Sequence, residues 1–114
     1  MKKRFDLLGL GCSAVDDILH VRAWPSADAK TQVLRRERHC GGLTATALVA
    51  AARLGGACAY AGVLGEDEDS AFVLDRLQHQ GIDISRMIRR RGVRPVRSVI
   101  IALTPPRLSR SALR

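Results

Sequence analysis

The sequence predicts an α/β protein with a small β-sheet that projects from its core. Short apolar runs alternate with helix-forming stretches, as in a parallel sheet that is covered by helices. Two half-polar segments lie between the first apolar run and the first helix, however, and these do not fit a plain strand–helix–strand repeat. The 114 residues are 46% hydrophobic and only 4% aromatic, so aliphatic side chains must fill one modest core.

The N-terminal part supplies one buried strand and two exposed strands. Residues 5–11 form a short apolar run that ends in glycine, and they predict a buried strand. Asp16 follows this run, at the position where open α/β sheets hold ligands; a turn or cap aspartate is the alternative interpretation. Residues 18–24 and 30–39 are partly polar and predict strands with one solvated face, the second of them antiparallel. We expect these strands, within about residues 17–39, to cover a site as a lid.

A glycine pair opens the most helix-forming stretch of the chain, residues 40–55. Gly41 and Gly42 allow backbone amides to approach a ligand closely, because neither residue carries a Cβ. The helix that follows would point its unpaired N–H groups and the positive end of its dipole at the same place. Arg53 in the last turn and Gly55 just after it are typical of a helix end. This stretch predicts a buried helix whose first turn faces a ligand; a core helix after a tight turn is the simpler alternative.

The rest of the chain predicts a strand, a helix, an edge segment, a strand and a tail. Residues 57–64 predict a second buried strand, and an acidic cluster then leads into a helix over residues 70–80. We assign the acids to electrostatics at the helix start in preference to a metal site. Residues 82–88 predict a short edge segment, and residues 96–103 predict a third apolar strand. Residues 104–114 show neither periodicity and predict an irregular basic tail.

Charge and cysteine content argue against several classes of function. The net charge is +8, but residues 86–114 hold nine arginines and no acid, whereas residues 1–85 are near neutral. Aromatic side chains are not interleaved with these arginines, so nucleic acid is disfavoured as a partner. Three scattered cysteines lack metal-site spacing and favour reduced thiols in the cytoplasm. No apolar run reaches the roughly 18 residues of a membrane span.

Seven short motifs occur in an order that is specific to one family. They are Gly9-Leu10-Gly11, Asp16, Trp24-Pro25, Gly41-Gly42, Ala50-Ala51-Ala52-Arg53-Leu54-Gly55, Gly62-Val63-Leu64-Gly65-Glu66-Asp67 and Gly81-Ile82-Asp83. In this order and spacing, about residues 5 to 103 resemble the N-terminal third of the ribokinase-like, or PfkB, family of carbohydrate kinases. The resemblance implies that residues 1–103 form part of a Rossmann-type three-layer core with a projecting β lid. It also implies phosphoryl transfer from ATP, with magnesium, to a hydroxymethyl group of a sugar or nucleoside.

The resemblance assigns substrate contacts to four residues. Asp16 matches the family's aspartate near the end of the first strand, where a carboxylate accepts hydrogen bonds from sugar hydroxyls. Gly41 and Gly42 match the family's di-glycine turn, whose backbone approaches the sugar. Thr46 stands where ribokinase-type members have a sugar-binding asparagine, and Ala14 replaces a second asparagine. Both replacements argue against ribose as the substrate.

Two further comparisons narrow the expected function. Residues 45–47, taken with Pro25-Ser26 and Lys30, resemble the branch of the family that includes sulfofructose kinases. The family's catalytic aspartate lies in a Gly-Ala-Gly-Asp-type motif of the C-terminal half, and this sequence contains neither that motif nor a P-loop. We therefore expect no catalytic residue, no ATP or Mg²⁺ site and no turnover by this chain alone.

Three functions are compatible with these residues. The first is the N-terminal portion of a sugar kinase, and the loss of pattern after Leu103 then suggests a truncated or frameshifted product. The second is a non-catalytic sugar-binding or dimerising remnant, with a homodimer formed through the lid. The third is a basic interaction protein that acts through its arginine-rich end.

Overall fold

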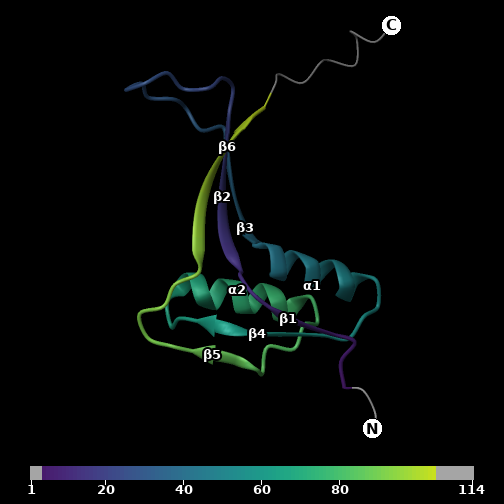
Figure 1. Cartoon of the computed structure of the whole chain (residues 1–114). Helices are drawn as coiled ribbons and strands as arrows, with labels where there is room; N and C mark the ends of the chain where they lie inside the picture. The colour runs from purple at the N-terminus through teal and green to yellow at the C-terminus, as the bar shows by residue number, and fades with distance from the viewer. Residues whose placement is uncertain (1–3, 105–114) are drawn as a thin grey trace, which may run out of the picture.

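The computed structural model describes residues 4–104 as six strands and two helices. In chain order these are β1 (Leu7–Leu10), β2 (Ala14–Val21), β3 (Arg35–Gly41), α1 (Leu43–Arg53), β4 (Cys58–Leu64), α2 (Glu68–His79), β5 (Met87–Arg89) and β6 (Val96–Leu103). Figure 1 shows a core of sheet and helices and a second sheet that projects from it. The expected α/β fold with a projecting β lid is therefore confirmed. Most of the expected tail lies outside the described residues.

The core sheet contains β1, β4 and β5 in that order, and all its strands are parallel. Helices α1 and α2 pack on one face of this sheet (Figure 1), so the described residues form two of the three expected layers. The prediction that the first strand is buried is wrong, because Leu8 and Leu10 are 52% and 71% exposed. The physical reason is position: β1 is an edge strand, with a paired neighbour on only one side among residues 4–104.

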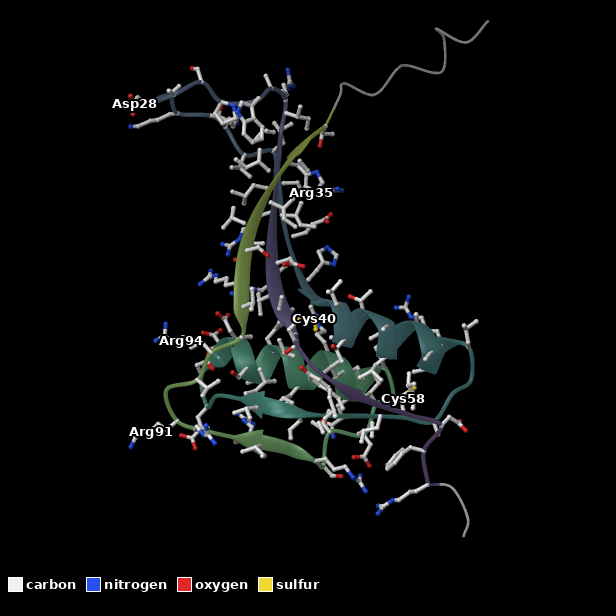
Figure 2. The ribbon with its side chains drawn as sticks, viewed as in Figure 1. Asp28, Arg35, Cys40, Cys58, Arg91 and Arg94 are labelled. Atoms are coloured by element: carbon white, nitrogen blue, oxygen red, sulfur yellow. The ribbon has the colours of Figure 1, made fainter. Side chains whose placement is uncertain are left out.

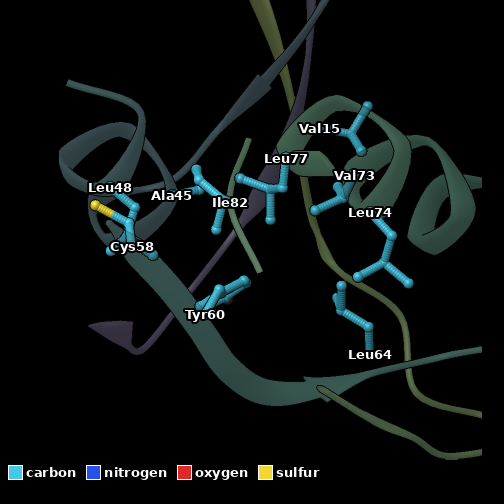
Figure 3. Packing of buried hydrophobic residues seen from close by; sticks show 10 residues of the cluster. All are labelled: Val15, Ala45, Leu48, Cys58, Tyr60, Leu64, Val73, Leu74, Leu77 and Ile82. Carbon is cyan, nitrogen blue, oxygen red and sulfur yellow. The ribbon is translucent and has the colours of Figure 1, made fainter. Parts of the chain in front are cut away.

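The buried core joins both helices to β4 and to the start of β2. Figure 3 shows its members, Val15, Ala45, Leu48, Cys58, Tyr60, Leu64, Val73, Leu74, Leu77 and Ile82. The only ring in this cluster is that of Tyr60, whose hydroxyl donates a 2.6 Å hydrogen bond to the carbonyl of Gly11. The bond satisfies a buried polar group and also ties β4 to the segment that leads from β1 into β2.

The helix ends follow the sequence expectations. Helix α1 begins immediately after Gly42, which has a φ of 93°, and Gly55 follows its end with a φ of 94°. Helix α2 carries two acidic residues in its first turn, and Gly81 follows its end with a positive φ of 76°. The expectation that α1 is a buried helix is only half right. Its inner face is buried, but Leu43 and Leu54 are 85% and 90% exposed, because no described element covers the outer face.

The lid sheet has the order β3-β2-β6, in which β2 is antiparallel to β3 and parallel to β6. Strand β2 starts earlier than expected, so Asp16 and Asp17 lie within it instead of preceding it. The third apolar strand, residues 96–103, is present but belongs to the lid and not to the core sheet. Periodicity alone could not show this, because an apolar run fits a strand of either sheet.

A cluster of charged side chains joins the lid to helix α2. The carboxylate of Asp17, which is only 3% exposed, lies 3.2 Å from Arg36, 3.4 Å from Arg38 and 3.0 Å from Arg97. Arg38 also donates a 2.9 Å hydrogen bond to Asp69 in the first turn of α2. Hydrogen bonding from Arg97, with further help from Arg36 and Arg38, holds the pKa of Asp17 below its ordinary value of 3.8. These five residues, the Asp17 cluster, bind all three lid strands to one another and to the core.

The lowered pKa of Asp17 predicts how the stability of the fold depends on pH. A carboxyl with a depressed pKa in the folded state stabilises the fold above its unfolded pKa, and that stabilisation is lost as pH falls through the folded value. We expect Asp17→Asn to lower the thermal unfolding midpoint at neutral pH, and the midpoints of the two proteins to converge below about pH 4. Circular dichroism melts across this range measure the effect.

The control is Asp75→Asn, the same change on α2, since Asp75 is exposed and its ion pair is with the exposed His79. We expect a smaller loss from this variant, because solvent-exposed ion pairs contribute little. A midpoint difference between wild type and Asp17→Asn that stays constant down to pH 2 would contradict the prediction.

Candidate functional site

The four residues singled out in the sequence meet at one hollow where the lid joins the core. Asp16, Gly41, Gly42 and Thr46 all line this space, which has a volume of about 610 Å³. The full lining is Cys12, Ala14, Asp16, Gly41, Gly42, Leu43, Thr46, Ala47, Ala50 and Val96. We call it the Asp16 hollow. Its walls come from the loop after β1, the base of the lid strands and the outer face of α1.

The alternation of strand β2 directs Asp16 to this hollow. Asp17, the next residue, points to the opposite face of the lid and enters the ion-pair cluster with α2. Asp16 lies opposite His39 of β3 and Ser98 of β6 in the sheet register. The hydroxyl of Ser98 donates a 2.5 Å hydrogen bond to Oδ1 of Asp16. Oδ2 lies against Gly41, where a Cβ would overlap it, so a glycine is required for this carboxylate position.

Gly42 brings the first turn of α1 against the loop that leads into β2. A Cβ at this position would lie 2.7 Å from the Cα of Ser13 and 2.8 Å from the carbonyl oxygen of Cys12. No side chain caps the helix start, and its first turn holds no acidic residue. The positive end of the helix dipole therefore lies at the edge of the Asp16 hollow, and the nearest acidic group that the hollow offers is Asp16 itself.

Thr46 lies one turn into α1 and is exposed. It lines the Asp16 hollow and also a second hollow of about 430 Å³ on the other side of α1. That second space lies between α1 and α2, under the end of β3, and its lining contains three arginines. The structure thus separates two neighbouring spaces by a single helix.

Ser98 and Val96 are site residues that the sequence interpretation missed. Both residues come from β6, and Ser98 follows Asp16 by 82 residues in the chain. No local signal predicts this contact, because it depends on β6 pairing with β2 across the whole intervening core. Cys12, whose spacing from the other cysteines predicts only a reduced thiol, also lines the hollow.

The arrangement suits hydrogen bonding to hydroxyl groups, because a carboxylate and a threonine hydroxyl line the same hollow. Among the described residues, no group of three or more His, Cys, Asp or Glu side chains could hold a metal. Asp16 is the only acidic residue in the lining of its hollow. No phosphate-binding motif is present in the sequence.

No helix within residues 4–104 has the length and apolar character needed to cross a membrane.

Comparison with known proteins settles the family. The family model described as pfkB family carbohydrate kinase matches residues 12–105. The chain belongs to the pfkB family. A nucleoside kinase from Methanothermobacter thermautotrophicus is 31% identical over 88 residues, which cover 77% of this chain and 28% of that relative. The chain therefore spans less than a third of the length of this curated relative.

Solved structures of the family share the fold. A protein from Agrobacterium tumefaciens described as a ribokinase matches with a TM-score of 0.76 and 29% identity, over 83% of this chain and 31% of its own. The aminoimidazole riboside kinase of Salmonella enterica, solved with aminoimidazole riboside and an ATP analogue, matches with a TM-score of 0.62 and 25% identity. That match covers 84% of this pfkB-family chain and 28% of the other. The expected partial ribokinase-like fold is confirmed.

The close approach at Gly42 predicts an unequal cost of alanine at two glycines of similar φ. Gly55→Ala introduces a Cβ into open space, so its cost is that of the positive φ alone, about 1 kcal/mol of unfolding free energy. Gly42→Ala meets the backbone of Ser13 and Cys12 as well, and we expect a loss of about 3 kcal/mol. Urea unfolding of both variants gives the difference. Equal losses of unfolding free energy in the two variants would show that the added Cβ at position 42 does not clash with the backbone of the loop.

Proposed function

We propose that this chain forms the sugar-binding wall of a pfkB-type kinase, with the sugar in the Asp16 hollow. The observation that carries the proposal is the meeting of an oriented carboxylate, a glycine turn and a helix start without a side-chain cap at one hollow. The curated relative is a nucleoside kinase, and the aminoimidazole riboside kinase structure contains its riboside. A sugar or nucleoside is the substrate class that both relatives support.

The chemistry assigned to the hollow is recognition of hydroxyl groups. Ser98 occupies one lone pair of Asp16 Oδ1, which leaves Oδ2 to accept hydrogen bonds from sugar hydroxyls. The hydroxyl of Thr46 can donate or accept from the other wall. A threonine is shorter than the asparagine of ribokinase-type members and offers one fewer donor. This difference supports a substrate other than free ribose, such as the ketose derivatives of the sulfofructose kinase branch.

The transfer step itself is assigned to groups outside this chain. This assignment is supported by the lining of the hollow, in which Asp16 is the one acidic residue, so that no second carboxylate is present there as a base. We propose that the chain alone binds sugar without phosphorylating it.

The three cysteines form no disulfide, which supports a reducing compartment, the cytoplasm, as its location.

Ligand titration of the 114-residue chain tests the sugar site. We expect inosine or fructose, and ribose more weakly, to shift the amide resonances of residues 12–16 and 41–46 in NMR spectra, and no product to form when ATP and Mg²⁺ are added. Asp16→Asn should weaken the binding of the responding sugar about tenfold, because a charge-assisted acceptor is lost. Ser98→Ala keeps the carboxylate but releases its orientation, and it should weaken binding about threefold.

The matched control is Asp28→Asn, the same change of charge at the lid tip, far from the base of the lid (Figure 2). Asp28 has a φ of 57°, a conformation that asparagine tolerates well. If Asp28→Asn weakens sugar binding as much as Asp16→Asn, or if no sugar shifts these amides at high millimolar concentration, the proposed site is wrong.

We also propose that two copies of the chain associate through their lids. Apolar side chains of β6 are exposed in the structure, among them Val99 at 62% and Leu103 at 56%, and Trp24 near the lid tip is 67% exposed. Burial of such a face in a homodimer would remove apolar area from water. Sedimentation velocity should show dimers that Val99→Lys weakens and that Val63→Lys, a similar change on core strand β4, leaves intact. A wild-type chain that remains monomeric at high micromolar concentration would reject the interface.

A further inference from the structure

We propose that the groove between α1 and α2 binds a small organic phosphate, held by Arg53 and Arg76 above an apolar floor. This groove is the hollow of about 430 Å³ on the far side of α1 from the Asp16 hollow. Its volume lies in the range of small-molecule sites, roughly 300–1,000 Å³. The proposal concerns a second ligand and is independent of the sugar site.

The lining of the groove combines a buried apolar floor with a cationic rim. Ala45, Val49 and Leu77 form the floor, and Ala45 and Leu77 are fully buried members of the core. The rim carries arginine and histidine side chains from β3, α1 and α2, and no acidic residue lines the groove. A ligand that complements this surface has an apolar or ring-shaped body and a negative charge.

Two of the three arginines are available for such a charge. Arg38 is already engaged by Asp17 and Asp69. Within residues 4–104, neither Arg53 nor Arg76 has a carboxylate within ion-pair distance. An unneutralised guanidinium presents a planar fork of N–H donors that matches the oxygens of a phosphate.

Local contacts bring these two arginines to the same stretch of the groove. Arg53 Nε donates a 3.1 Å hydrogen bond to Oε1 of Gln80, which leaves its terminal nitrogens free to contact a ligand. Gln80 follows Arg76 by four residues at the end of α2, so the two lie about one helical turn apart on the same side. The guanidinium of Arg76 is also held in place, because it stacks 5.2 Å from the ring centroid of Phe72. The two cations are thus positioned before a ligand arrives.

Phenyl phosphate is a suitable probe, because its ring matches the apolar floor and its dianion matches the two arginines. We expect saturable binding to the full chain, followed by calorimetry and by the side-chain Nε–Hε resonances of the arginines. Arg53→Gln and Arg76→Gln should each weaken binding about tenfold, since each removes a charge-assisted contact. Inorganic phosphate and phenol, which each lack one half of the probe, should bind more weakly. Saturating amounts of the sugar that responds in the NMR titration should leave the affinity for phenyl phosphate unchanged.

The control is Arg91→Gln, which changes the net charge equally on the connection between β5 and β6 (Figure 2). All three arginines are exposed, so none of these variants should disturb folding, and a melt of each checks this. If Arg91→Gln weakens binding as much as Arg76→Gln, the attraction is only that of a basic protein for an anion, and the groove is not a site. Equal binding of inorganic phosphate and phenyl phosphate would reject the role of the apolar floor.

Discussion

The position of the lid depends on one buried carboxylate. Asp17 lies almost fully out of water, and such a charge is tolerated only when opposite charges and hydrogen bonds replace the lost hydration. Arginines from both neighbouring lid strands meet it, and two of them, Arg38 and Arg97, also lie within ion-pair distance of Asp69 on α2. Because the three lid strands share this carboxylate, they sit over the core as one unit. The base of that unit is where the Asp16 hollow forms.

Local sequence signals were sufficient for the helices and for the site residues on consecutive elements. The glycines around α1 and α2 predicted where these helices end, and the acidic cluster indicated the start of α2 to within two residues, because capping and dipole effects act locally. The resemblance to the family assigned Asp16, Gly41, Gly42 and Thr46 to one substrate site, and in the structure these residues line one hollow. Their role in binding a sugar stays a prediction.

The sequence did not predict which strands pair when they are far apart in the chain. Strand β6 is as apolar as a core strand, yet it pairs with β2 in the lid, and Ser98 reaches Asp16 only through that pairing. Burial was misjudged for the same reason. The apolar run around Leu8 indicates a buried strand by composition, but exposure is decided by which elements lie beside it, and β1 has a paired neighbour on one side only within residues 4–104.

Asp16 and Asp17 are adjacent in β2 but face opposite sides of the lid, and this affects which substitutions the chain can accept during evolution. Because neighbouring residues of a strand face opposite ways, Asp16 and its partner Ser98 can be replaced without disturbing the contacts of Asp17. The proposed sugar contacts and the support of the lid are thereby carried by separate sides of the same three strands. Substitutions can then change the Asp16 hollow on one surface while the ion pairs on the other surface hold the lid in place. A single-residue insertion in β2 is the exception, since it would exchange both sides at once.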